Sequence, residues 1–347
     1  MNFKKIFLYI PGFLMAILIA YISRIIEDIL PIHMIGASVI ALFIGMTVHH
    51  FYKPGEILKR GITFTSKRVL KFAIILLGAS LNINMVLQVG KMSMLVMAFT
   101  LMTCFGGGYF IGKAFGLNWK MSNLISAGTG ICGGSAIASI APVIDADDLD
   151  IAFAMSATFI FDMFMIILFP IMGRALNMSD MAYGLWTGTA VNDTSSVVAA
   201  GYAFSEAAGD FATMVKLTRT LSIIPTVVVF ALINLHIKRK DKINSKTNLH
   251  IVKIIPWFIL GFLAMVWINS AGYISPEFSH SLKNISKFLM VASLAAIGLS
   301  TSFKDMKKSG IKPMLHGFVV SVLVIIVALA VEYFMGILYR SILRRDL

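Results

Sequence analysis

Long apolar segments are the feature that most constrains how this chain can fold. A helix needs roughly 20 mostly apolar residues to cross a bilayer. Eleven such segments lie at 6–23, 30–50, 69–88, 92–112, 121–144, 151–173, 183–204, 210–235, 251–272, 283–303 and 311–338. They are too long and too irregular for barrel strands, and helices satisfy their own backbone hydrogen bonds, as lipid requires. We therefore predict an all-α polytopic membrane protein, with residues 1–347 forming a single transmembrane domain.

Composition and charge support this class. The chain is 58% hydrophobic and 14% charged, whereas a soluble domain is about 45–50% apolar and about 25% charged. The net charge of +13 would suggest nucleic-acid binding in a soluble protein, but the basic residues here lie in short loops, where they orient the spans. We predict a cytoplasmic N-terminus, which places residues 236–250 inside and Arg24, Lys283 and the acidic stretches 145–150 and 206–210 outside. Arg340, Arg344 and Arg345 disagree with this orientation.

Two segments are poor candidates for continuous helices. Residues 128–135 read Gly-Thr-Gly-Ile-Cys-Gly-Gly-Ser, and each glycine destabilises a helix by about 1 kcal/mol relative to alanine. Residues 188–196 read Gly-Thr-Ala-Val-Asn-Asp-Thr-Ser-Ser, with six polar side chains that do not belong against lipid. Broken backbone in a membrane requires surrounding protein or a water-filled cavity. Paired interrupted helices indicate the substrate site of a transporter, so we expect the two breaks to meet near the bilayer midplane.

Internal similarity favours a duplicated, inverted-repeat architecture. At a spacing of 60, the pairs include Gly128 with Gly188 and Ser135 with Ser195. A second similarity links residues 78–95 with residues 298–315. The order of these matches differs from that of a simple tandem duplication, so the register of the repeat stays open.

The two broken segments supply most of the candidate binding residues. The spacing of Gly128, Gly130 and Gly133 fits a dinucleotide fingerprint, but that motif needs a preceding strand, and none is expected. Unwound glycines can instead turn backbone N–H groups toward an anion at a helix N-terminus, or simply allow close helix packing. The candidate substrate-binding residues are Thr129, Gly130, Gly133, Gly134, Ser135, Thr189, Asn192, Asp193, Thr194, Ser195, Lys216 and Arg219.

Four intramembrane charges carry most of the expected chemistry. Lys216 and Arg219 are three residues apart, which places them on one helix face, and lipid exposure would cost roughly 2.5–3.5 kcal/mol per cation. We expect both to face the protein interior with Asp193 as counter-charge; snorkelling to the headgroups is the alternative. Asp162 and Asp193 are the candidate carriers of a coupled ion. Glu332 is expected to be interfacial.

These motifs resemble the YeiH family of bacterial inner-membrane proteins, usually described as sulfate exporters. The resemblance rests on residues 128–138 and 186–195, on Val-Lys-Leu-Thr-Arg at 215–219, and on Ala-Ile-Gly-Leu-Ser at 296–300. It implies a carrier related to bile-acid/sodium symporters and sodium/proton antiporters, with inverted repeats, crossing broken helices, and multi-pass insertion in the bacterial inner membrane. The family motif often has His where this chain has Asn192, so a proton-coupling role of that His would be lost.

The sequence therefore predicts a secondary active transporter of a small anion, with sulfate or an organic sulfonate as the best candidates. A monovalent cation/proton antiporter is the alternative, and a passive channel is a weaker one. We expect no enzymatic activity, because no serine or cysteine has an evident histidine base, and no cofactor or nucleic-acid partner. The expected partners are the anion, a coupling proton or sodium ion, and the lipid bilayer. A homodimer is an open alternative.

Overall fold

A computed structural model describes residues 8–29, 37–240, 257–301 and 310–337. Within these ranges the chain is helical and contains no strand. The prediction of an all-α fold is therefore confirmed for the described part of the chain. Segments 30–36, 241–256 and 302–309, together with both ends, lie outside it, so most of the predicted cytoplasmic stretch 236–250 is not described.

The chain divides into two compact units, each built from three separate stretches of sequence. The first unit comprises Met1–Gln88, Val198–Gly209 and Trp257–Lys307, and the second comprises Val89–Val197, Asp210–Pro256 and Lys308–Leu347. Three of the five boundaries fall inside α6 (Ile83–Met102), α12 (Thr194–Phe204) and α13 (Glu206–Thr220). Because the chain changes unit within helices, the sequence has no linker at these points.

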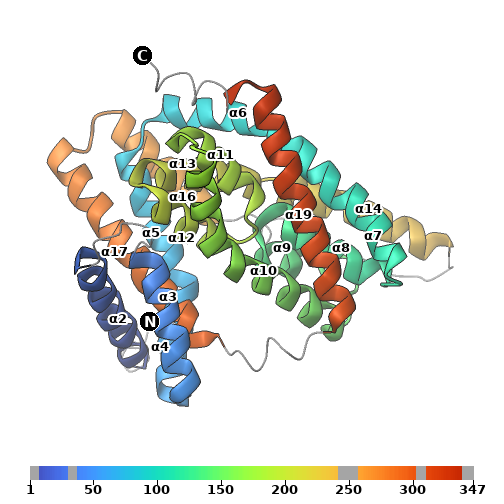
Figure 1. Cartoon of the computed structure of the whole chain (residues 1–347), viewed down its shortest axis with the longest axis horizontal. Coiled ribbons are helices and arrows are strands. Elements are labelled where there is room, and N and C mark those ends of the chain that lie inside the picture. Colours follow the sequence, from blue (N-terminus) through green and yellow to red (C-terminus); the bar gives the residue numbers. More distant parts are fainter. Residues whose placement is uncertain (1–7, 30–36, 241–256, 302–309, 338–347) are drawn as a thin grey trace. The chain divides into compact units, whose positions relative to one another are not determined.

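Small residues hold the first unit together. Its other helical elements are α2 (Ile10–Ile29), α3 (Ala37–Phe51), α4 (Glu56–Phe64), η1 (Thr65–Val69), α5 (Leu70–Leu77), η2 (Gly78–Ser80), α16 (Trp257–Ser270) and α17 (Pro276–Ser300). Helix α17 packs against α2, α3 and α5 (Figure 1). A Cβ built on Gly298 would lie 2.9 Å from Met46 N, and one on Gly45 would lie 2.8 Å from Leu299 N. Glycines thus let α3 and α17 approach closely, as in many membrane helix pairs.

The second unit contains both predicted broken segments. Its other elements are η3 (Thr103–Gly107), α7 (Gly108–Ala114), α8 (Trp119–Ala127), η4 (Gly128–Cys132), α9 (Gly134–Ile140), α10 (Asp148–Ala175), α11 (Asp180–Ala190), α14 (Ile223–Lys240) and α19 (Ile311–Phe334). Helix α19 packs against α8, α10 and α11, and the Trp186 indole N–H donates to Ile325 O at 3.1 Å. An apolar core joins α8, α9 and α14.

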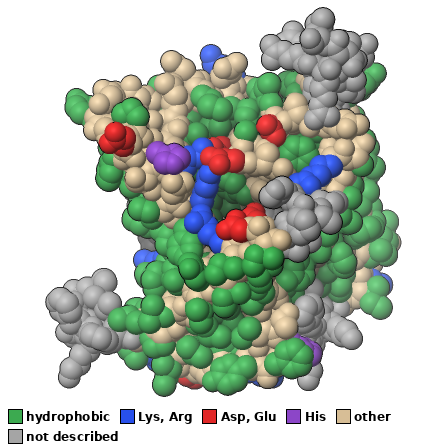
Figure 2. All heavy atoms as spheres, turned by 60° about the vertical axis from the view of Figure 1, so that its left-hand side comes forward, with side chains coloured by type: hydrophobic (Ala, Val, Ile, Leu, Met, Phe, Trp, Pro, Cys, Tyr) green, Lys and Arg blue, Asp and Glu red, His purple; other side chains and the backbone are tan. Residues whose placement is uncertain are grey.

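Six helices among the described residues are long and apolar enough to cross a membrane. They are Ile10–Ile29, Ile83–Ala114, Leu149–Ala175, Glu206–Ile237, Pro276–Ser300 and Ile311–Phe334. Two shorter apolar helices, Ala37–Phe51 and Trp257–Ser270, accompany them, and much of the surface is hydrophobic (Figure 2). These helices make the chain a polytopic membrane protein.

The expected set of eleven spanning segments is not what the structure gives. The segment expected at 69–88 ends as a helix at Ser80, and α6 begins at Ile83. The two broken segments consist of helices of 7 to 11 residues, too short to cross alone. The count differs because apolar composition does not reveal where a helix stops inside an apolar run. The helices do not establish an inverted repeat either, and it stays a prediction.

Candidate functional site

The first broken segment is interrupted where the glycines cluster. Helix α8 leads into the π-helical turn η4, and Gly133 then reverses the chain with φ of +65° and ψ of −134° before α9 begins. Residues other than glycine rarely adopt this backbone conformation, because their Cβ atom clashes with the backbone. The Gly133 N–H donates to Gly128 O at 2.9 Å and closes the turn. The predicted interruption is confirmed, and its point is fixed by Gly133.

The second segment breaks within its polar run. Helix α11 ends at Ala190, Val191 is extended with ψ of 138°, and α12 begins at Thr194. Asp193 Oδ2 accepts the Ser195 N–H at 2.9 Å and also the Ser195 hydroxyl. A carboxylate in this position caps the N-terminus of a helix, so Asp193 starts α12 and also faces the break.

The two interruptions lie against each other in the second unit. A Cβ built on Gly133 would sit 2.9 Å from Asp193 Oδ1 and 3.0 Å from Asp193 Cβ. We call the place where Gly128–Gly133 meets Val191–Asp193 the helix crossing. The predicted meeting of the two breaks is confirmed, whereas their depth in a bilayer stays a prediction.

Two buried cations bind the backbone of the helix crossing. Lys216 and Arg219 are 0% and 1% exposed on α13, so their expected inward orientation is confirmed. Lys216 Nζ donates to Val191 O at 2.9 Å. Arg219 donates through Nε to Gly130 O at 2.5 Å, through Nη2 to Thr129 O at 2.8 Å, and through Nη1 to Val191 O at 3.4 Å.

The expected role of Asp193 as counter-charge to these cations stays a prediction. No ion pair joins Lys216 or Arg219 to Asp193 among the described residues. The last carbonyls of a helix lack intrahelical donors and carry the negative end of its dipole. A broken helix creates such an end inside the protein, and the cations bind there instead of to a carboxylate.

Asp162 binds the same crossing from α10. Its side chain is 1% exposed and accepts the N–H groups of Asn192 at 3.1 Å and Asp193 at 3.0 Å. The positive end of α12 therefore lies beside Asp162, while the negative ends of the preceding helices lie beside Lys216 and Arg219. The crossing gathers two cations and two carboxylates, so its formal charge is zero.

Several buried polar atoms at the crossing have no hydrogen-bond partner among the described residues. They are Oγ1 of Thr129 and both amide atoms of Asn192. Leaving such groups unpaired costs about 1–3 kcal/mol each.

The remaining expected residues fall into two groups. Asp193, Thr194 and Gly134 are half-buried, Ser135 is exposed, and a Cβ on Gly134 would meet no atom within 4 Å. Ser195 is 8% exposed beside Asp193, and Gly130 lies against Cys104. Thr189 is buried inside α11, where its hydroxyl donates to Leu185 O at 2.7 Å. The crossing thus combines buried residues with neighbours that are more exposed.

Glu332 is buried within the protein, and its expected interfacial depth stays a prediction. It is 0% exposed on α19, and both carboxylate oxygens lack a partner within the part of the chain that the structure describes. In the same part, no group of three or more His, Cys, Asp or Glu side chains is positioned to hold a metal ion.

The apolar helices and the buried crossing define a polytopic α-helical membrane protein. The family model described as "Conserved hypothetical protein 698" matches residues 11–317. The chain is 55% identical over 337 residues to a UPF0324 membrane protein of Clostridium tetani (strain Massachusetts / E88), covering 94% of this chain and 98% of that protein. It is 39% identical over 334 residues to a UPF0324 membrane protein of Streptococcus pneumoniae serotype 4 (strain ATCC BAA-334 / TIGR4), covering 94% of this chain and 97% of that protein. The chain belongs to this family of membrane proteins. No solved structure matches it.

Proposed function

We propose that this chain is a secondary active transporter of a small anion, with the helix crossing as its binding centre. The observation that carries the proposal is the buried crossing itself. There, Thr129 and Asn192 have hydrogen-bonding atoms without partners among the described residues, beside Lys216 and Arg219. A site that contains buried polar groups and charges inside a membrane protein is a functional candidate by default.

The chemistry of the unpaired groups suits an oxyanion. A hydroxyl and an amide N–H₂ both donate hydrogen bonds, and Arg219 has N–H groups beyond those already bound to carbonyls. Sulfate and organic sulfonates present several acceptor oxygens with negative charge, so charge-assisted hydrogen bonds would form. The resemblance to the YeiH family supports the same substrate class.

Charge balance favours coupling to a cation. The four charged side chains at the crossing sum formally to zero, so a bound anion would leave an uncompensated negative charge in a medium of low dielectric constant. A proton or sodium ion entering with the anion would compensate it. Asp193 is the better carrier because it is half-buried, whereas Asp162 is buried and uses both oxygens to hold backbone N–H groups.

The position of the breaks supports a duplicated architecture. Gly133 and Asp193 are equivalent at the spacing of 60 residues found in the sequence, and they lie against each other. Equivalent positions meet where a two-fold axis passes between two repeats. Inverted repeats with paired broken helices are typical of secondary transporters.

A cation/proton antiporter is the second candidate, and one observation favours it. Arg219 and Lys216 already donate to the carbonyls of Thr129, Gly130 and Val191, which reduces their capacity for an anion. The two carboxylates at the crossing could then bind a cation and a proton in turn.

Transport by the purified protein in liposomes separates the two candidates. Sulfate-loaded vesicles that accumulate radiolabelled sulfate by counterflow, without sodium-driven collapse of a pH gradient, support the anion carrier. Collapse of the gradient by sodium without sulfate counterflow supports the antiporter. Failure of both assays in vesicles that contain folded protein would contradict both functions.

A further inference from the structure

The first unit carries an exposed basic surface on one continuous helical stretch. The elements α4, η1 and α5 follow one another without a gap from Glu56 to Leu77. Lys59 pairs with Glu56 at 3.4 Å, and both side chains are largely in solvent, at 68% and 82% exposed. Three further exposed cations of this stretch form no ion pair within the described residues. We call the four residues Lys59, Arg60, Lys67 and Arg68 the basic face.

The π-helical turn η1 brings the two pairs of cations to one side of the helix. An α-helix rotates by about 100° per residue, so Arg60 and Arg68, eight residues apart, would point about 80° away from each other in a regular helix. A π turn contains one extra residue, which takes back about 100° and leaves the two about 20° apart. Lys59 and Lys67 have the same spacing. The turn therefore concentrates charges that a regular helix would spread.

Packing on the opposite side fixes the direction of the basic face. Gly61 and Thr65 are buried, and a Cβ built on Gly61 would lie 2.8 Å from Gly12 Cα of α2, the helix beside α4 (Figure 1). Helix α17 also packs against α4 and η1. Lys71, by contrast, lies 5.5 Å from the centroid of the Phe258 ring and is not counted in the face. The helix cannot rotate to hide its charges without losing these contacts.

Exposed aromatic side chains accompany the basic face. Phe64 and Phe72 are 37% and 53% exposed on the same stretch, and Phe51 and Tyr52 directly before it are 83% and 59% exposed. Aromatic rings beside basic residues are typical of the boundary between membrane and water. We propose that the basic face binds the headgroups of anionic phospholipids.

Charge complementarity favours this partner. The face presents four cations against the single carboxylate of Glu56, and a lipid surface offers a plane of phosphates that matches charges spread along a helix. Each basic residue near such a surface contributes roughly fivefold in affinity, and the attraction depends on charge more than on which basic residue supplies it. The inference does not rest on the proposed function, because the basic face belongs to the first unit and the helix crossing to the second.

Quenching of a fluorophore by labelled lipids tests the proposal. The full chain carries Cys104→Ala and Cys132→Ala, which remove the native thiols, and a fluorophore on Thr63→Cys, at an exposed position between Arg60 and Lys67. It is placed in nanodiscs that contain nitroxide-labelled phosphatidylglycerol or phosphatidylcholine at equal mole fraction. We expect phosphatidylglycerol to quench several-fold more strongly, and high salt to reduce the difference because it screens exposed charges.

A double variant and a matched control locate the effect. Arg60→Gln with Lys67→Gln should remove most of the preference for phosphatidylglycerol. Lys91→Gln with Lys113→Gln, which removes two exposed cations from the second unit, should keep it. Equal thermal midpoints of the two variants show that both are folded, as expected for exposed side chains.

Three results would overturn the proposal. Equal quenching by the two lipids in the parent, or by neither of them, would show that the basic face does not select anionic headgroups. The same loss of preference in both double variants would assign the effect to net charge alone. A response to an added oligonucleotide without any preference between the lipids would identify nucleic acid as the partner instead.

Discussion

Arg219 shows how a charged residue is accommodated inside the second unit. Its guanidinium donates to carbonyls from both broken segments, Thr129 and Gly130 on one side and Val191 on the other. These carbonyls are exposed by the ends of interrupted helices, where no N–H of the same helix reaches them. Arg219 therefore stabilises the two breaks together, whatever further role it has toward a substrate.

Replacing Arg219 by lysine keeps the positive charge but removes the several N–H donors of the guanidinium, so it should separate the contributions of the two. A single ammonium group cannot reach all three carbonyls at once, so Arg219→Lys should lower the free energy of unfolding by about 1–3 kcal/mol and weaken anion transport. Thermal unfolding and sulfate counterflow measure the two effects. Arg68→Lys on the exposed surface is the control, and an equal response of both variants would contradict the assigned contacts.

For individual residues, the sequence predicted which charged side chains are buried better than it predicted their hydrogen-bond partners. Two cations three residues apart in an apolar helix have to avoid lipid, so the inward orientation of Lys216 and Arg219 could be inferred. Their partners could not, because unpaired carbonyls such as Val191 O appear only once the helix ends are known. Asp193, the expected partner, caps α12 instead.

The broken segments are the elements that build the helix crossing. In each, a helix ends inside the second unit and a new one begins within a few residues, at Gly133 in one and at Val191–Asp193 in the other. This arrangement brings backbone N–H and C=O groups to a place where uninterrupted helices would offer neither. The breaks thus supply hydrogen-bonding groups in an otherwise apolar environment, and Asp162, Lys216 and Arg219 bind them.

Neighbouring glycines in the first break should respond differently to the same substitution. Gly133→Ala forces a side chain into φ of +65° and toward Asp193, so we expect a loss of about 1–3 kcal/mol in unfolding free energy. Gly134→Ala places its Cβ in open space at the start of α9, so stability should stay the same or rise slightly. The thermal midpoints of both variants in detergent provide the measurement. A larger loss in Gly134→Ala would show that the backbone at this break is assigned wrongly.

At the element scale, glycine and polar runs predicted both breaks, because these residues oppose a helix in lipid. The ends of the helical elements at Ser80 and at Thr220 could not be predicted in the same way. Both lie close to apolar stretches, and their position depends on packing between helices that are distant in the sequence. For example, a Cβ on Gly78 would lie 3.2 Å from Met265 Cβ.

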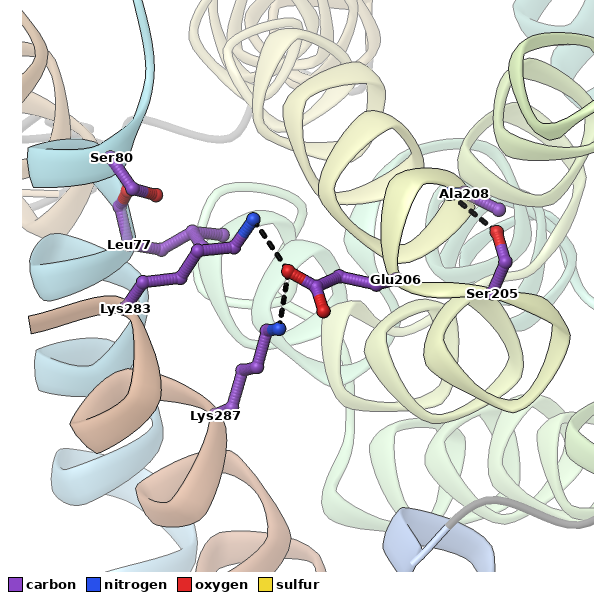
Figure 3. A network of polar contacts seen from close by, with 7 residues as sticks. All are labelled: Leu77, Ser80, Ser205, Glu206, Ala208, Lys283 and Lys287. Atoms are coloured by element: carbon purple, nitrogen blue, oxygen red, sulfur yellow. Dashed lines mark hydrogen bonds and ion pairs between the residues drawn. The ribbon is translucent and has the colours of Figure 1, made fainter. Parts of the chain in front are cut away.

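The whole molecule consists of two units whose sequences are interleaved. Each unit consists of three stretches that alternate along the chain with those of the other unit, so neither could be expressed as one continuous fragment. Glu206, Lys283 and Lys287 meet in the first unit (Figure 3), and the charge pattern had placed Glu206 and Lys283 on the same, outer side. Their contact agrees with the expectation that Glu206 and Lys283 lie on the same side of the membrane. It does not show which side that is, so the orientation of the N-terminus stays a prediction.

Cysteine labelling of intact cells tests the predicted orientation. With the buried Cys104 and Cys132 replaced by alanine, a cysteine introduced at Lys240 should resist a membrane-impermeant maleimide, because the basic stretch 236–250 is expected inside. A cysteine introduced at the exposed Glu277 should react, since it precedes Lys283 on the expected outer side. Labelling at Lys240 without labelling at Glu277 would show that the topology is the opposite of the predicted one.

The variant Asp193→Asn tests the proposal that the helix crossing binds a transported anion and its coupling ion. The measurement is sulfate uptake into proteoliposomes with and without an imposed gradient of the coupling ion, with Glu56→Gln as a control for loss of one negative charge. The asparagine side chain keeps an oxygen that can accept the Ser195 N–H and cap α12. Unlike a carboxylate, however, it cannot take up a proton. We predict that gradient-driven uptake is lost while exchange at equal concentrations is retained. Parental rates of both uptake and exchange in Asp193→Asn would contradict a coupling role of Asp193 and place the site elsewhere.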